Sequence, residues 1–267
     1  MAFTLDESAV ADYARDGVVV VRGAFGAEEV ALVAAGIEAN LASPGPLVAV
    51  ASDADDPGSF IEDFCNWQRI SEFEEFIRRS PAASIAQQLM ASSTVRLYHD
   101  HLLVKEASTR QRTPWHQDIP YYNVDGFQNV SMWMPVDPVP VESTLEFVAG
   151  THLGPWLMPR TFKDAQAKWF PEGALGDLPD IEADRDAFAI LAWALEPGDA
   201  VFFHMVTVHG AAGSSALRRV FSVRFLGDDM VHAPREWRTS PQFEGLADEL
   251  PAGVPMDHPL FPLLIGG

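Results

Sequence analysis

The sequence predicts a mainly β fold, a barrel or a sandwich, with flanking helices. From Thr94 onward, short runs of β-branched and aromatic residues are separated by Gly, Pro and Asp, which is the pattern of many short strands. No helical segments alternate with these runs, which disfavours a parallel α/β sheet. The chain has 267 residues, 48% of them hydrophobic, and can bury a sizeable core in one large domain.

The first part of the chain, about residues 1–93, is predicted to be mainly helical. Thr4 and Glu7 have the spacing of a capping box ahead of a helix that ends at Gly17. The acidic stretch 52–62 is expected to be a loop. The other predicted elements of this part are a short strand over 18–21 and helices over 27–42, 73–79 and 82–90.

The barrel is expected over about residues 94–226, and the whole chain, 1–267, is expected to form one domain. Strands are predicted over 94–105, 115–121, 128–136, 145–149, 188–195, 200–206 and 218–226. The segment 152–187 is a long insertion with a possible helix over 162–169. Its aromatic residues, Trp156, Trp169 and Phe170, suggest a lid over a substrate, or else permanent packing on the barrel. The tail 227–267 is expected to wrap irregularly over the core.

The charge balance excludes some classes of partner. Lys and Arg number 18 and Asp and Glu 38, which gives a net charge of −20. Binding to nucleic acid or to an anionic membrane needs the opposite sign. A single cysteine, Cys65, rules out an intrachain disulfide framework. No stretch reaches the roughly 20 apolar residues of a membrane-spanning helix, and the amino terminus has no signal-peptide pattern. We expect a cytoplasmic protein with a small-molecule substrate; its oligomeric state is not predicted.

One histidine and one aspartate form a candidate metal pair. His116 and Asp118 lie at the start of a predicted strand, where residues i and i+2 share a face and can bind one ion. Alone, the pair could also be a barrel histidine followed by a turn aspartate. His209 strengthens the metal interpretation, because it follows the apolar run 200–203 and precedes Gly210. Two histidines and one carboxylate are the ligand set of non-haem Fe(II) oxygenases.

Other residues leave alternatives open. His99 and His101 are also an i, i+2 pair and could serve a cupin-like site, although no glycine framework or suitably spaced carboxylate accompanies them. Arg218 and Arg219 enter the last predicted strand. An arginine at the mouth of an apolar barrel suits a dicarboxylate, because its planar fork holds a carboxylate through two hydrogen bonds. Either arginine could instead be solvated and paired with a surface acid.

Together these segments resemble the phytanoyl-CoA dioxygenase family of Fe(II)- and 2-oxoglutarate-dependent oxygenases. The resemblance extends over nearly the whole chain and depends on the order of its motifs. The matching segments are 13–20, 99–105, His116-Gln117-Asp118, Trp133, 150–152, Gly198-Asp199, His209-Gly210 and Arg218-Arg219.

The resemblance implies a double-stranded β-helix (a jelly-roll, cupin-like barrel) and a set of site residues. His116, Asp118 and His209 would bind Fe(II) and form the catalytic centre. Arg218 would hold the distal carboxylate of 2-oxoglutarate, with its neighbour Arg219 as the alternative. The remaining implied positions are Trp133 and His101 at the co-substrate, and His99 and Tyr122 at the substrate.

The reaction implied by the resemblance is hydroxylation of a small molecule, with O2 and 2-oxoglutarate consumed and succinate and CO2 released. Asp118 disfavours a halogenase, which needs that metal position for halide. The rivals are a catalytically silent metabolite- or protein-binding barrel and a cupin-type isomerase. Some members use an upstream lysine at the co-substrate; here no lysine precedes Lys105, so Asn66 and Arg69 are the candidates. With three lysines and no basic cluster, a CoA ester is not implied.

Overall fold

The largest element of the fold is an eight-stranded antiparallel sheet. The computed structural model describes residues 3–158 and 175–266. The strand order is β1-β10-β7-β12-β4-β3-β2, with β14 also paired to β4. The strands are β1 (Val18–Val21), β2 (Ala49–Val50), β3 (Phe60–Phe64), β4 (Val95–Lys105), β7 (Asn129–Pro135), β10 (Ala200–Phe203), β12 (Arg218–Leu226) and β14 (Leu263–Ile265).

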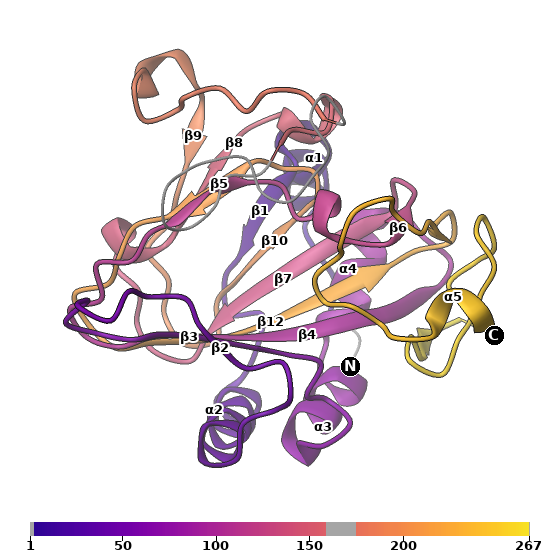
Figure 1. Cartoon of the computed structure of the whole chain (residues 1–267), viewed down its shortest axis with the longest axis horizontal. Coiled ribbons are helices and arrows are strands. Elements are labelled where there is room, and N and C mark those ends of the chain that lie inside the picture. The colour runs from indigo at the N-terminus through magenta and orange to yellow at the C-terminus, as the bar shows by residue number, and fades with distance from the viewer. Residues whose placement is uncertain (1–2, 159–174, 267) are drawn as a thin grey trace.

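A smaller, four-stranded sheet lies across from the first (Figure 1). Its order is β5-β11-β8-β9, and its strands are β5 (Thr113–His116), β8 (Leu145–Val148), β9 (Ile190–Leu191) and β11 (His209–Ala211). A two-stranded ribbon of β6 (Val124–Asp125) and β13 (Val231–His232) lies beside them. Two facing antiparallel sheets form the jelly-roll that the family resemblance implied.

Helices cover the outer face of the large sheet, as Figure 1 shows for α2, α3 and α4. The helices are α1 (Glu7–Asp16), α2 (Ala27–Ala42), α3 (Ser71–Arg79), α4 (Ala82–Met90) and α5 (Leu246–Glu249). Short 3-10 turns occur at Ile119–Tyr121, Val141–Ser143, Thr151–Leu153 and Arg185–Ala187. None of the helices in the described part of the chain is long and apolar enough to cross a membrane.

Strand alternation decides what each face of the large sheet carries. Along β12, Phe221, Val223 and Phe225 belong to the core that the helices cover. Burying each such side chain contributes about 1.5–3 kcal/mol. The alternate residues of the strand point to the opposite face, toward the small sheet, and two of these are Arg218 and Arg224. The apolar residues of β12 thus fix where its polar residues point.

Several sequence predictions of secondary structure need correction. The capping box of Thr4 and Glu7 does not form; Asp6 is the N-cap of α1, and the N–H of Leu5 donates to Gln88 instead. The expected loop 52–62 runs into β3, because Phe60 is buried in the interior although acids surround it.

The predicted boundaries of the barrel also change. The expected strand over 188–195 shortens to β9, and His209 lies on a strand that the sequence did not predict. The large sheet takes strands from both flanking parts of the chain, so the range 94–226 is too narrow for the barrel. The possible helix over 162–169 lies outside the described residues.

Candidate metal centre and cavity

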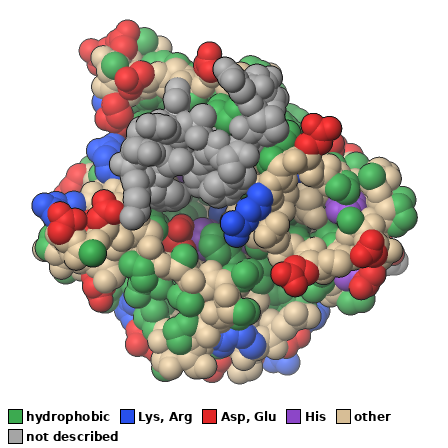
Figure 2. Space-filling model, in the orientation of Figure 1, with side chains coloured by type: hydrophobic (Ala, Val, Ile, Leu, Met, Phe, Trp, Pro, Cys, Tyr) green, Lys and Arg blue, Asp and Glu red, His purple; other side chains and the backbone are tan. Residues whose placement is uncertain are grey.

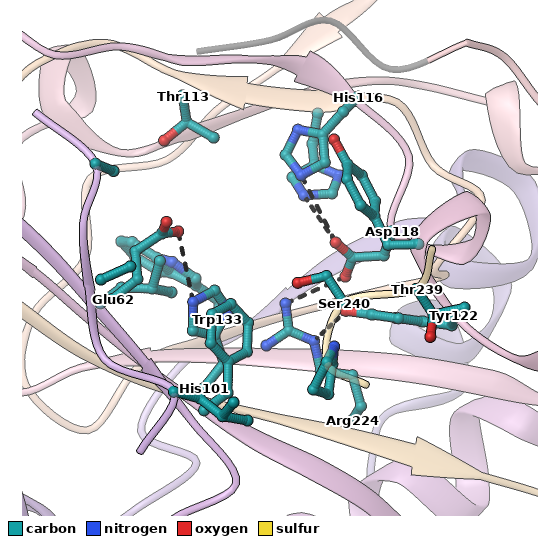
Figure 3. A pocket seen from close by; sticks show the side chains of 18 of the residues that line it. Glu62, His101, Thr113, His116, Asp118, Tyr122, Trp133, Arg224, Thr239 and Ser240 are labelled. Atoms are coloured by element: carbon teal, nitrogen blue, oxygen red, sulfur yellow. Dashed lines mark hydrogen bonds and ion pairs between the residues drawn. The ribbon is translucent and has the colours of Figure 1, made fainter. Parts of the chain in front are cut away.

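Two histidines and one aspartate converge between the two sheets. His116 ends β5 and lies directly opposite His209 of β11, which brings the two ring centroids to 4.2 Å. Asp118 lies in the turn after β5, where its N–H donates to the carbonyl of Met205. Oδ1 of Asp118 is 3.7 Å from Nε2 of each histidine (Figure 3). The three potential ligand atoms therefore lie within 4.8 Å of one another.

The reason for this convergence differs from the one that the sequence suggested. The strand expected over 115–121 ends at His116, and Asp118 has helical backbone angles, φ −71° and ψ −43°. His116 and Asp118 are thus brought together by a turn rather than by alternation along one strand. The pairing of β5 with β11 then adds His209.

Hydrogen bonds on the far side of each ring prepare the histidines for a cation. Nδ1 of His116 lies 2.8 Å from the carbonyl of Pro114, and Nδ1 of His209 lies 2.9 Å from that of Thr207. A carbonyl only accepts, so Nδ1 carries the proton and Nε2 keeps its lone pair. Two nitrogen lone pairs and a carboxylate oxygen then face one another too far apart to hydrogen-bond. This donor set fits a metal ion.

The electrostatics favour the metal-binding forms of His209 and Asp118. Burial lowers the pKa of His209 to about 3, so this imidazole is neutral at neutral pH. Burial opposes ionisation of Asp118, but the Arg224 guanidinium holds its pKa well below the usual range. A ligand must be deprotonated to bind a metal ion, and both the His209 imidazole and the Asp118 carboxylate meet this condition at neutral pH.

The second oxygen of Asp118 has its own partners. Oδ2 accepts a hydrogen bond of 2.9 Å from Ser131 and one of 3.3 Å from Nη2 of Arg224. Nε of Arg224 donates to the hydroxyl of Tyr122, and Nη1 donates to Oγ of Ser222. Arg224 and its carboxylate partner are both buried. The sequence analysis did not single out Arg224.

Arg218 and Arg219 face opposite sides of the large sheet. Arg218 is buried, lies 5.4 Å from the Trp133 ring centroid and donates to the carbonyl of Ser143. Its Nε is buried and finds no acceptor among residues 3–158 and 175–266. Arg219 instead pairs with Asp137 and Glu38 on the helix side.

A buried lysine lies beside Arg218. Lys105 is directly opposite in the register of β4 and β12, and its Nζ donates to the carbonyls of Gln111 and Ala212. Burial, with the nearby charge of Arg218, lowers the pKa of Lys105 to about 6. At neutral pH the guanidinium is therefore the charged group of this pair, and it is oriented to receive an anion.

His101 and Glu62 line the wall across from the metal triad (Figure 3). His101 of β4 stacks on Phe64, with ring centroids 3.8 Å apart. Its Nε2 is 3.5 Å from Oε1 of Glu62, which lies on β3. Burial lowers the pKa of His101, although Glu62 opposes this. Glu62 was missed because its segment was expected to be a loop. The available signal was its position between Phe60 and Phe64, two aromatic residues that share its face on a strand.

The other predicted site residues have different surroundings. Tyr122 lines the cavity, whereas His99 does not, because His99 packs behind Tyr122 with ring centroids 5.1 Å apart. In the described part of the chain, neither histidine of the His99–His101 pair belongs to a metal-ligating cluster. Asn66 and Arg69, the candidates for the upstream lysine role, are not among the cavity-lining residues.

The metal triad, Arg218 and Arg224 line one cavity of about 480 Å³, together with Glu62 and His101. Figure 2 shows it as a hollow with acidic and histidine side chains inside and hydrophobic side chains gathered below. One edge is formed by 47–51, where Leu47 and Val50 are exposed, and the opposite edge by 238–242. Trp156 contacts Arg235 outside this lining. Trp169 and Phe170 lie outside the described residues.

A jelly-roll with two histidines and one carboxylate at a shared point defines the class of cupin-fold, mononuclear metal enzymes. The family model of phytanoyl-CoA dioxygenase (PhyH) matches residues 13–220. The chain therefore belongs to the phytanoyl-CoA dioxygenase family of Fe(II)- and 2-oxoglutarate-dependent oxygenases, as the motifs predicted. A probable phytanoyl-CoA dioxygenase of Caenorhabditis elegans is 24% identical over 185 residues, 66% of this chain and 53% of that protein. The match spans about half the length of that relative.

Two solved structures resemble the whole chain. The non-haem α-ketoglutarate-dependent carbocyclase SnoK of nogalamycin biosynthesis is 25% identical, with a TM-score of 0.76 over 97% of this chain and 96% of that one. The epimerase SnoN, solved with Fe3+, α-ketoglutarate and a nogalamycin derivative, is 25% identical, with a TM-score of 0.74 over 97% and 98%. α-Ketoglutarate is 2-oxoglutarate.

Proposed function

We propose that this protein is an Fe(II)- and 2-oxoglutarate-dependent oxygenase that hydroxylates a small molecule. The observation that carries the proposal is the convergence of His116, Asp118 and His209, with both Nδ1 atoms bound to carbonyls and both Nε2 atoms facing the carboxylate. These three residues would hold Fe(II). Three protein ligands on one side of an ion leave positions for a co-substrate and O2.

The Fe(II) ion that this site would hold, together with 2-oxoglutarate, would supply the oxidative chemistry. When bound, Fe(II) with 2-oxoglutarate activates O2, and the co-substrate is converted to succinate and CO2. The residues of the protein would bind and orient the co-substrate and the substrate, and they would exclude water from the cavity. Asp118 and His209 lie deep between the sheets, and aromatic side chains such as Tyr121, Trp133 and Phe203 line the cavity around them.

Arg218 would bind the distal carboxylate of 2-oxoglutarate. Its buried Nε has no acceptor among the described residues, and a carboxylate would supply one. Trp133, which lies against the guanidinium, would hold the carbon chain of the co-substrate on one side. His101 would contact the co-substrate from β4, because it lines the same cavity from the strand next to β12.

The substrate would enter between the apolar edge formed by 47–51 and the edge formed by 238–242. Exposed Leu47 and Val50 favour a substrate with a substantial apolar body. Tyr122 would line the substrate side of the cavity, and His99 would support the Tyr122 ring rather than touch substrate.

Epimerisation or carbocyclisation is the second candidate outcome. It is favoured by the similarity to SnoK and SnoN, which have those activities and the same overall fold. All three outcomes share removal of a hydrogen from the substrate. They differ in whether an oxygen atom is then added to the product.

The test is turnover of 2-oxoglutarate under 18O2 with a panel of apolar ring-containing substrates. We expect succinate formation that requires Fe(II) and rises with a true substrate, together with a product that gains one 18O atom. An oxidised or inverted product without 18O would favour the second outcome. No Fe(II)-dependent succinate under any condition would favour a catalytically silent barrel.

A further inference from the structure

We propose that Arg224 is a positioning residue that fixes Asp118 so that its Oδ1 faces the metal site. The inference rests on the proposed function and adds a residue that the ligand motif does not contain. Oδ1 of Asp118 faces Nε2 of both histidines, whereas Oδ2 faces away, toward Arg224 and Ser131. The two oxygens thus have different tasks.

Arg224 is itself held on several sides. Nε donates to the Tyr122 hydroxyl at 3.0 Å, Nη1 donates to Oγ of Ser222 at 2.7 Å, and Nη2 reaches Oδ2 of Asp118 at 3.3 Å. Ser222 is on the same strand, β12, and its hydroxyl donates onward to the carbonyl of Met132 in β7. The guanidinium is therefore anchored to the large sheet and cannot follow a moving carboxylate.

This anchoring matters because a carboxylate contributes to a metal site only while its oxygen points at the other ligands. If Oδ2 lost its two donors, Asp118 could turn and carry Oδ1 away from the two Nε2 atoms that it now faces. The site would then hold the ion with two well-placed ligands in place of three. A charge-assisted hydrogen bond from Arg224, together with the hydroxyl of Ser131, opposes this rotation.

The direction in which metal affinity changes when Arg224 is replaced distinguishes a positioning role from a purely electrostatic one. A buried positive charge beside the metal site repels a cation, so removing Arg224 should tighten metal binding if charge alone mattered. A positioning role predicts the reverse, since loss of a residue that orients a metal ligand typically weakens metal binding about 10- to 100-fold. It also explains why a cation is buried 3.3 Å from Oδ2, the oxygen of Asp118 that faces away from the metal site.

The experiment is a titration of the metal-free full chain with Co(II), followed by its visible absorption, for Arg224→Gln and Arg224→Lys. We expect both variants to need about 10- to 100-fold more Co(II), because lysine keeps the charge but cannot reach Asp118, Tyr122 and Ser222 together. Ser131→Ala should shift binding in the same direction by less. Arg219→Gln is the matched control, because its side chain lies on the other face of β12, and it should bind as the wild type does.

Metal affinity in Arg224→Gln equal to or tighter than that of the wild type would overturn the proposal, as would wild-type affinity in Arg224→Lys. If Arg224→Gln does not fold, the Co(II) affinity of Ser131→Ala is the deciding measurement. An affinity equal to that of the wild type would then count against the inference. His116→Ala separates this result from failure of the metal site itself. If His116→Ala also binds Co(II) as the wild type does, the assignment of the metal ligands is wrong, and with it the role of Arg224.

Discussion

Two neighbouring arginines at the start of β12 illustrate how the site is built at the residue scale. Arg219 shares its side of the sheet with Phe221 and Val223, and it ends in surface ion pairs. Arg218 shares its side with Ser222 and faces the cavity. A shift of one residue in register would exchange the two faces, so the apolar residues of β12 select which arginine faces the cavity.

We predict that Arg218→Ala weakens binding of 2-oxoglutarate by about 2–4 kcal/mol, because it removes one partner of a buried, hydrogen-bonded charge pair. Arg219→Ala should cost far less, since that side chain is tied to Asp137 and Glu38 outside the cavity. Isothermal titration with a non-oxidisable 2-oxoglutarate analogue compares the two variants. The opposite ranking would move the anchoring role to Arg219.

At the scale of elements, long periodic segments were predictable, and short strands that carry polar residues were not. Helices α2 and α4 begin and end within a residue of their predicted bounds, because apolar spacing and prolines mark them. Strand β3 was hidden because its inward-facing Glu62 and buried Asp63 make the segment look like an acidic loop. Strand β11, with three residues, is too short to carry an alternation pattern.

The candidate site was predictable as a set of residue types, but its geometry was not. The spacing of His116 and Asp118 and the Gly after His209 selected the triad from sequence. The turn that presents Asp118 depends on the carbonyl of Met205, far along the chain, and no local pattern encodes that. Arg224 was missed for the same reason, because its role depends on a long-range contact with Asp118.

The junction between α1 and β1 gives a prediction at this scale. Gly17 has φ +75°, and a Cβ there would lie 2.4 Å from Nδ1 of His152 and 2.5 Å from Oγ1 of Thr207. We expect Gly17→Ala to destabilise the protein by about 2–5 kcal/mol, through the left-handed backbone and the close contacts. Urea denaturation measures this change.

Gly23 is the matched control for that substitution. Its φ is +57°, but a Cβ there would meet no atom of the described part of the chain within 4 Å. Gly23→Ala should therefore cost only the backbone component, about 1–2 kcal/mol. Equal losses for Gly17→Ala and Gly23→Ala would show that close packing at Gly17 does not contribute.

At the scale of the whole molecule, a buried histidine links folding to pH. Nδ1 of His204 accepts from the N–H of Val206, and Nε2 lies 2.8 Å from the carbonyl of Phe127, so both nitrogens are paired only in the neutral ring. Burial lowers the pKa of His204 from 6.5 to about 4. Because this value lies below that of the unfolded chain, the unfolded chain takes up more protons as pH falls from about 6.5 to about 4, and stability is lost in that window.

We predict that the wild type loses about 2 kcal/mol more stability than His204→Gln between about pH 7.5 and about pH 5. The comparison between the two chains isolates His204, since Asp100, whose pKa burial raises to about 6, changes stability in the opposite direction in both. Chemical denaturation of the metal-free proteins at several pH values provides the measurement. Parallel pH profiles would exclude this role for His204.

In the proposed function, His116, Asp118 and His209 hold the Fe(II) that binds 2-oxoglutarate. The most direct test is an anaerobic titration of Fe(II) into the metal-free protein with 2-oxoglutarate, followed by the visible absorption of their complex. We predict that the wild type develops this absorption and that Asp118→Ala does not, while circular dichroism shows that its fold is kept, because the large core does not depend on the ion. The same absorption in Asp118→Ala, at the same Fe(II) concentration, would contradict the account.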